Sequence, residues 1–147
     1  MPVQDFIGTY KGQMDVAYAG MIAEGQIVRD VASKTVETAV VAFGLAVGAG
    51  TADGSAKLSG AGYLGITVAD KTRSADQYAV GEMAGVMRKG TIWVTVDGDV
   101  TDVSVVTFTV ATGEIGAKSV AAGIVAIPGA KFETTATNGA LARVYLG

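Results

Sequence analysis

The residues of this chain that could do chemistry form few combinations. The sequence contains neither Cys nor His, so a Ser-His-Asp triad, a Cys nucleophile, a disulfide and a zinc site of thiolates or imidazoles are excluded. Ser33 with Lys34 and Ser55 with Lys57 could pair a nucleophile with a base. Neither pair has the Ser-x-x-Lys spacing or lies in a nucleophile elbow, and we therefore expect no enzyme.

A cluster of carboxylates suggests a cation site. Asp97, Asp99 and Asp102 lie around Gly98, and oxygen ligands of this kind bind hard cations. Thr101 stands at the third ligand position, however, and no Glu closes the loop as in a calcium-binding motif. A solvated turn fits these residues better, and binding of a cation stays open as the alternative.

Residues 60–65, GAGYLG, match the dinucleotide-binding fingerprint as a string of letters. That motif needs a strand before it and the N-terminus of a helix after it, whereas Ile66 and Val68 continue a strand pattern. We interpret these glycines as a strand entry in which missing side chains allow close backbone packing, and we expect no cofactor.

The net charge disfavours nucleic acid as a partner, and the length of the apolar stretches disfavours a membrane-spanning segment. Eleven Lys and Arg against 14 Asp and Glu leave a net charge of −3, which provides no electrostatic footprint for nucleic acid. The charge-free stretches 38–52 and 119–130 fall short of the roughly 20 residues that cross a membrane. The first residues lack the pattern of a signal peptide, so we expect a protein that is made and used in the cytoplasm. The main basic grouping could meet an acidic partner or remain solvated; it comprises Lys71, Arg73, Arg88 and Lys89.

The elements that would position these residues are strands. In residues 91–96, Ile92, Val94 and Val96 alternate with Thr91, Trp93 and Thr95, and residues 103–110 and 140–146 alternate in the same way. Glycines at Asp53-Gly54, Asp97-Gly98 and Asn138-Gly139 supply positive φ for turns. The pattern predicts an all-β fold, a jelly-roll-like β-sandwich or barrel of about eight strands, with at most one short helical turn. The predicted strands are 38–47, 63–68, 83–87, 91–96, 103–110, 123–127, 131–134 and 140–146.

The periodicity also predicts which side chains are buried. We expect Val106, Phe108, Val144 and Leu146 in the core. Trp93 lies on the threonine face of its strand, where the N-terminal residues, a neighbouring subunit or the second face of a sandwich could cover it. The last of these is the most frequent arrangement.

The N-terminal residues follow neither period. Phe6, Tyr10, Tyr18 and Met21 are isolated among Gly, Gln and Asp, so residues 1–20 are predicted to form an extended arm and residues 21–147 a single β-domain. Aromatics in such an arm must pack on the parent domain or on another subunit. Because a Gly-rich β-protein with few charges must also cover its sheet edges, we expect a homodimer or a homotrimer.

Several motifs together carry a family resemblance. The segments VADKT at 68–72, YAVGEMAGVMRKGTIWV at 78–94, IPGAKF at 127–132 and GALARVYL at 139–146 occur in this order. They resemble segments of the structural cement, or decoration, proteins of tailed bacteriophages, and the resemblance covers about residues 18–147.

The resemblance implies a non-enzymatic virion component with a jelly-roll-like or barrel fold. Such a protein binds the outer surface of the assembled capsid, oligomerises and bridges neighbouring capsomers, so the implied partners are the major capsid protein and other copies of the chain. The alternative is a small β-sandwich module that binds a carbohydrate or receptor on a phage tail or fibre, although the isolated aromatics make a sugar platform hard to assemble. The candidate residues for capsid or subunit contact are Phe6, Tyr10, Tyr18, Met21, Arg88 and Lys89.

Overall fold

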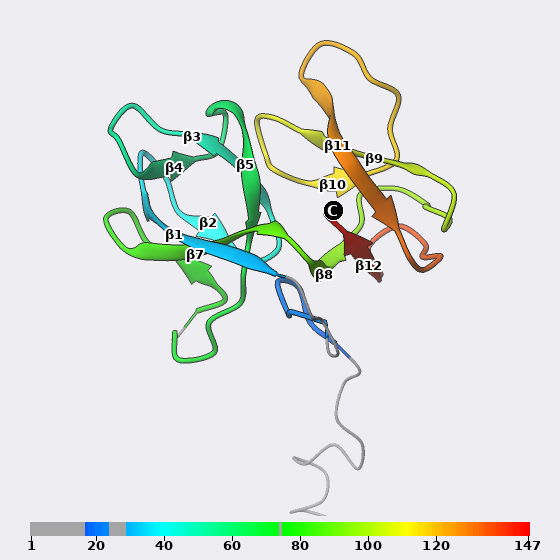
Figure 1. Cartoon of the computed structure of the whole chain (residues 1–147), viewed down its shortest axis with the longest axis horizontal. Coiled ribbons are helices and arrows are strands. Elements are labelled where there is room, and N and C mark those ends of the chain that lie inside the picture. The colour runs from blue at the N-terminus through cyan, green and yellow to red at the C-terminus, as the bar shows by residue number, and fades with distance from the viewer. Residues whose placement is uncertain (1–16, 24–28, 74) are drawn as a thin grey trace, which may run out of the picture.

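The computed structural model describes residues 17–23, 29–73 and 75–147 of the chain (Figure 1). All regular elements within these ranges are strands or isolated bridges, and none is a helix. Accordingly, the described chain offers no helix that could cross a lipid bilayer. The predicted all-β fold is confirmed.

Five strands close into a barrel on the left of Figure 1. Their order around the barrel is β1-β4-β3-β5-β7, and the pairs are antiparallel except for β1 with β4. The bounds are β1 Asp30–Val36, β3 Ala46–Ala49, β4 Ser55–Lys57, β5 Ala61–Thr67 and β7 Met83–Lys89.

A five-stranded antiparallel sheet lies beside the barrel, in the order β10-β9-β11-β12-β8. A further pair, β2 with β6, forms a two-stranded sheet. A barrel next to an open sheet agrees with the barrel alternative, and this strand order does not establish a jelly roll. The bounds are β2 Val41–Ala42, β6 Gln77–Tyr78, β8 Thr91–Thr95, β9 Val105–Thr109, β10 Ile115–Gly116, β11 Ile124–Phe132 and β12 Leu141–Tyr145.

A continuous ribbon joins the barrel to the sheet. Only Gly90 separates β7 in the barrel from β8 in the sheet, and its φ of 115° lets the chain bend there. The N-terminal part of the chain runs antiparallel to both strands, because Ile22 pairs with Ile92 and Asp30 with Lys89. The amide of Leu146 also donates to the carbonyl of Gly90 over 2.8 Å. Backbone hydrogen bonds from Ala46 to Gly113 and from Ser59 to Val110 hold the barrel side against the sheet side.

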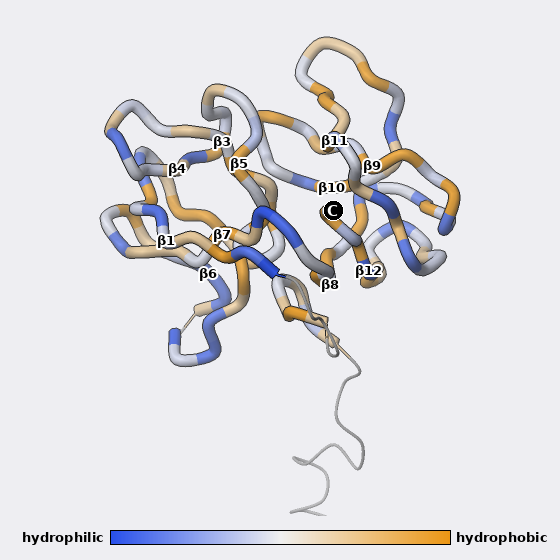
Figure 2. Tube along the Cα trace, in the orientation of Figure 1, coloured by the Kyte–Doolittle hydropathy of each residue, from blue (hydrophilic) through white to orange (hydrophobic). Residues whose placement is uncertain are grey.

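Two groups of buried side chains form the core. One fills the barrel around Phe43 and Tyr78, whose rings meet edge to face at 5.2 Å. The larger group joins sheet and barrel, with Ile66 and Met87 packed against the side chains of β8, β9 and β12; Figure 2 shows apolar residues along β7, β8 and β12. All the predicted core residues are buried as expected: Val106, Phe108, Val144 and Leu146.

Several strand boundaries differ from the predictions. The predicted strand 38–47 is divided into β2 and β3 because Gly44 has a φ of 75° and lies in a turn between them. The predicted strands 123–127 and 131–134 merge into β11, which passes through Pro128 and Gly129 with a shift in register. Asp97-Gly98 has the expected positive φ, yet it connects β8 to β9, which are not neighbours in the sheet. The strands that were not predicted are β1, β4, β6 and β10.

The glycines of residues 60–65 allow backbones to approach closely. A Cβ atom at Gly65 would lie 2.3 Å from the carbonyl oxygen of Met87, and one at Gly60 would lie 2.5 Å from the carbonyl carbon of Gly48. The chain then continues as β5 to Thr67 with no helix after it. The interpretation as a glycine-rich strand entry is confirmed.

Candidate functional site

The N-terminal segment covers the edge of the sheet at β8. The amide of Gly20 donates to the carbonyl of Trp93 over 2.8 Å, and the amide of Trp93 donates to the carbonyl of Met21 over 2.9 Å. Farther along, the amide of Ala23 donates to the carbonyl of Thr91 over 3.0 Å. Residues 20–23 thus act as a further strand, and an edge that could otherwise pair with another chain is occupied.

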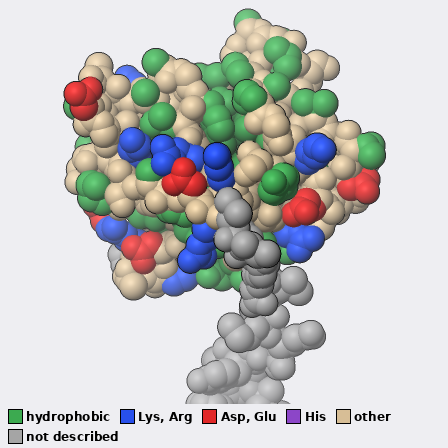
Figure 3. All heavy atoms as spheres, viewed as in Figure 1, with side chains coloured by type: hydrophobic (Ala, Val, Ile, Leu, Met, Phe, Trp, Pro, Cys, Tyr) green, Lys and Arg blue, Asp and Glu red, His purple; other side chains and the backbone are tan. Residues whose placement is uncertain are grey.

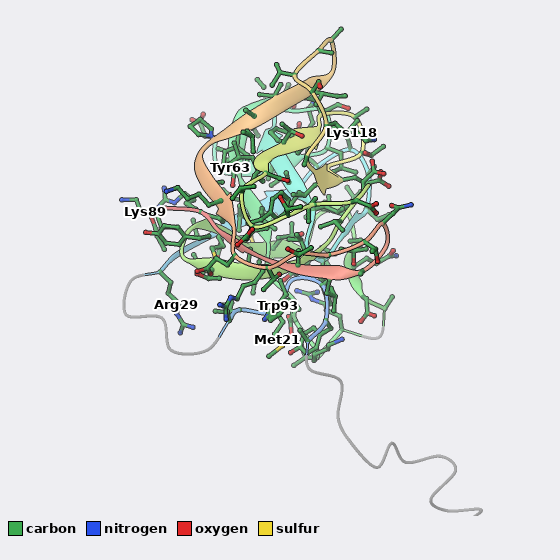
Figure 4. All side chains as sticks on the ribbon, turned by 90° about the vertical axis from the view of Figure 1, so that its right-hand side faces the viewer. Met21, Arg29, Tyr63, Lys89, Trp93 and Lys118 are labelled. Atoms are coloured by element: carbon green, nitrogen blue, oxygen red, sulfur yellow. The ribbon has the colours of Figure 1, made fainter. Side chains whose placement is uncertain are left out.

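Two of the four candidate contact residues near the N-terminus lie in the described part of the chain. Phe6 and Tyr10 fall outside the described residues. Tyr18 is 38% exposed, and the ammonium group of Lys71 lies 4.1 Å from its ring centroid in a cation–π contact. Met21 is half-buried beside Trp93 (Figure 4).

Tyr18 borders a groove of about 490 Å³ between the β2–β3 turn, the end of β8 and the turn before β12. Its wall includes Leu45, Lys71, Asp97 and Asn138. The polar groups in this wall are largely engaged, since Lys71 pairs with Asp76 at 3.5 Å and Asp97 with Lys118 at 2.5 Å. The groove therefore presents no unpaired catalytic couple among these side chains.

Two of the three carboxylates proposed as an alternative cation site, Asp97 and Asp99, stabilise turns. The contact with Lys118, labelled in Figure 4, lowers the pKa of the Asp97 carboxyl group. Asp99 accepts a hydrogen bond from the amide of Asn138 over 2.9 Å, and the Asn138 side chain accepts one from the amide of Gly98 over 2.9 Å. Asp102 is exposed. The described part of the chain contains no group of three or more acidic side chains able to hold a metal ion.

The serine of one Ser-Lys pair considered in the sequence, Ser55, is engaged in a turn. Ser55 is buried, and its hydroxyl donates to the carbonyl of Ala52 over 2.6 Å. In the same turn, Glu37 accepts hydrogen bonds from the hydroxyl and amide of Thr51, and these lower the pKa of Glu37 to about 2. Both side chains therefore stabilise the connection between β3 and β4.

The four residues of the basic grouping have separate surroundings. Arg73 pairs with Asp70 at 3.2 Å and also with Glu82, in the region after β5. Arg88 pairs with Asp30 at 2.7 Å near the end of β7. Lys89 is exposed, and it lies on the same side of the molecule as Arg29 in Figure 4. The basic residues near Arg73 and those near Arg88 therefore lie in different parts of the structure and do not form one patch.

A larger feature, which the sequence did not reveal, is the outer face of the five-stranded sheet. Lys131 lies opposite Val105 on one side and Tyr145 on the other, so that the three side chains form a row across β9, β11 and β12. Val105 is 66% exposed and Tyr145 43% exposed. The predicted alternation placed Tyr145 opposite the core side chains of its strand, but it could not show which strands lie beside it.

A second row lies next to the first. Arg143 is opposite Trp93 in the ladder of β12 and β8, and its guanidinium pairs with Glu133 at 3.2 Å. Trp93 is half-buried on this face and lies beside the N-terminal segment, which was one of the predicted alternatives. We call the surface made by Met21, Trp93, Val105, Lys131, Arg143 and Tyr145 the outer face.

Comparisons with known proteins relate this architecture to bacteriophage heads. A chain described as the capsid of Myoviridae phage XM1 is 17% identical, with a TM-score of 0.73, and the match covers 95% of this chain and 96% of that chain. The N base of the head fibre gp8.5 of bacteriophage phi29 is 12% identical, with a TM-score of 0.50, over 82% of this chain and 95% of that chain. These likenesses concern the fold. No curated protein sequence matches the chain.

A family model provides the assignment. The model of the structural cement proteins, described by E217 gp24 and Pam3 gp6, matches residues 6–147. This match covers nearly the whole chain and includes all the segments on which the resemblance was based. The chain therefore belongs to the family of structural cement proteins of bacteriophages.

Proposed function

We propose that this protein is a non-enzymatic component of the phage virion that binds the outer surface of the capsid and holds neighbouring capsomers together. The observation that carries the proposal is the family match over residues 6–147, which leaves little of the chain for a separate catalytic module. The proposed partners are the major capsid protein and further copies of this chain. Synthesis in the host cytoplasm precedes assembly on the capsid exterior.

Binding alone is sufficient for this role. A protein that binds the assembled lattice but not its dissociated subunits stabilises the lattice by mass action. Many copies on one capsid add their contributions, so that modest affinity for each site still gives strong retention. The chemistry of the described residues supports a binding role, because Ser55 and Asp97 are engaged in turns and ion pairs.

The proposed contacts begin with the N-terminal segment. Tyr18 and Met21 lie where the chain joins the sheet edge, and Tyr18 is accessible for contact. Arg88 and Lys89 are exposed at the end of β7. Together with Phe6 and Tyr10 they are our candidates for contact with the capsid or with a neighbouring subunit.

The test uses capsids that lack the cement protein. Purified full-length protein is mixed with expanded capsids, and bound protein is measured by co-sedimentation and located by cryo-electron microscopy. Saturable binding at the seams between capsomers supports the proposal. Failure to bind such capsids, together with retention on a panel of immobilised glycans, would instead identify a carbohydrate-binding module. Sedimentation velocity of the free protein tests for the dimer or trimer.

A further inference from the structure

The two faces of the five-stranded sheet differ in how far their apolar side chains are exposed. Its inner face carries Ile92, Val94 and Val144, which have no measurable exposure and pack towards the barrel. On the outer face, Val105 is 66% exposed, and Val103, in the turn before β9, is 87% exposed. Large apolar side chains that gather on one exposed surface commonly mark an interaction site.

The residue types on the outer face are those that anchor protein interfaces. Trp, Tyr and Arg dominate interaction hot spots, and this face presents Trp93, Tyr145 and Arg143 on two adjacent strands. Ladder pairing on both sides of β12 fixes the backbone that carries Tyr145 and Arg143, so no backbone has to become ordered there when a partner binds. The face is also continuous with Met21 in the strand-like N-terminal segment.

The charges on and next to this face are mainly positive. Arg143 is paired with Glu133, whereas Lys131 and Lys89 have no carboxylate within ion-pair distance among the described residues. Figure 3 shows Lys and Arg side chains, some with Asp or Glu side chains beside them, among hydrophobic ones on the side of the molecule that carries β1, β7, β11 and β12. Lys131 on the face and Lys89 next to it are therefore positive charges that no described carboxylate neutralises, on a chain whose net charge is −3.

The position of Lys131 argues against a second copy as the occupant. A two-fold dimer places the same patch of each subunit face to face. Because the outer face contains Lys131 and Arg143 but no carboxylate of its own, and the adjacent Glu133 is already paired with Arg143, such a dimer would bring two positively charged patches together. A partner with an apolar surface and an acidic rim matches both the anchors and the charges.

We propose that the outer face of the five-stranded sheet is the surface that docks on the capsid, and that it binds an apolar patch with an acidic rim on the capsid protein. This inference rests on the proposed function. Trp93, Tyr145 and Arg143 are the anchors, and Lys131 supplies the complementary charge.

The experiment compares variants of the outer face with matched variants of the barrel in capsid co-sedimentation. The pair V105T and Y145T, combined in one protein, removes exposed apolar area and places threonine, a β-branched residue that suits strands, at both positions. Its control is V80T, since Val80 is 54% exposed on the barrel side of the chain. K131E reverses the central charge, and K57E on β4 is its control. Circular dichroism and melting temperature confirm folding.

We expect V105T/Y145T and K131E each to weaken capsid binding at least tenfold, while V80T and K57E remain within twofold of wild type. The effect of K131E should diminish as salt is raised, because added ions screen exposed charges. Equal binding by outer-face and barrel variants would overturn the docking surface while leaving the capsid function intact. If the wild type is a dimer and V105T/Y145T is a monomer, the outer face serves self-association, and the proposed docking surface is overturned. Failure of the wild type to bind capsids would overturn the proposed function and this inference with it.

Discussion

The amide of Trp93 donates to the carbonyl of Met21 over 2.9 Å, and this contact joins the N-terminal segment to the edge of the five-stranded sheet. Two further backbone hydrogen bonds, from Gly20 to Trp93 and from Ala23 to Thr91, extend the pairing. The arm and the sheet are therefore linked at a position beside the proposed docking surface. The consequences can be tested separately for the segment that pairs and for the residues before it.

Deleting residues 1–23 should destabilise the protein by about 3 kcal/mol. The deletion removes three backbone hydrogen bonds to β8, each worth about 1 kcal/mol, and uncovers the sheet edge. Urea unfolding measures the stability, and sedimentation velocity measures association through the exposed edge. Wild-type stability in this deletion would show that the pairing contributes little.

Deleting residues 1–16 tests the arm hypothesis instead. We expect the melting temperature to stay within a few degrees, because the buried Ala17 and the pairing at residues 20–23 are retained. Capsid binding should weaken tenfold or more, since burial of Phe6 and Tyr10 is worth about 1.5–3 kcal/mol each before ordering costs. The full-length F6S/Y10S variant should behave like the deletion, and Q4S/Q13S should behave like wild type. If the deletion and F6S/Y10S both bind capsids as well as wild type, the contact lies outside residues 1–16.

Phe108 is central to the core between the sheet and the barrel. Its ring lies 5.6 Å from that of Tyr63, and the residue is only 4% exposed. Phe108→Ala should lower the free energy of unfolding by about 3–5 kcal/mol. In the same strand, Val105→Ala should cost less than about 1 kcal/mol because Val105 points to the outer face. Thermal or urea unfolding distinguishes the two, and similar losses would contradict the assigned faces.

The contact between β5 and β7 depends on a missing side chain. A Cβ atom at Gly65 would lie 2.3 Å from the carbonyl oxygen of Met87, so Gly65→Ala should force the strands apart and cost about 1–3 kcal/mol. Gly85 on β7 is the matched control, because an added Cβ would meet its nearest neighbour at 3.5 Å. Gly85→Ala should therefore be tolerated in the same unfolding assay. If Gly85→Ala is more destabilising than Gly65→Ala, β5 and β7 do not approach each other closely at Gly65.

Glu37 should make stability depend on pH in the acid range. Its folded-state pKa of about 2 lies below the ordinary value of 4.5, because Thr51 donates hydrogen bonds to the carboxylate. The stabilisation of the folded state by the ionised Glu37 carboxylate is therefore present above pH 4.5 and is lost as the pH falls towards 2. The difference in unfolding free energy between wild type and E37Q should shrink over this range.

A direct titration provides the control for Glu37. We expect NMR to give a midpoint near 2 for this carboxyl group, and Thr51→Val should shift the midpoint upward towards 4.5 by removing the hydroxyl donor. An ordinary midpoint in the wild type would show that the hydrogen bonds do not form in solution.

The sequence by itself determined local properties of this chain. Alternation in residues 91–96, 103–110 and 140–146 identified the buried side of three strands, and the predicted core residues Val106 and Phe108 are buried. Asn138-Gly139 and Asp97-Gly98 were identified as turn sites, and both glycines have positive φ. These properties depend on the period of a strand and on the steric freedom of single glycines, which neighbouring residues reveal.

Only the tertiary structure decided how the strands are arranged and which side chains lie together. The alternation placed Tyr145 away from the core, but the row that it forms with Lys131 and Val105 depends on the register of three strands from distant parts of the chain. The polar strand β1 was missed because its pattern is weak, and it is held by pairing with β7 and β4. Register and strand order result from long-range packing and backbone hydrogen bonding, and a local period carries no information about either.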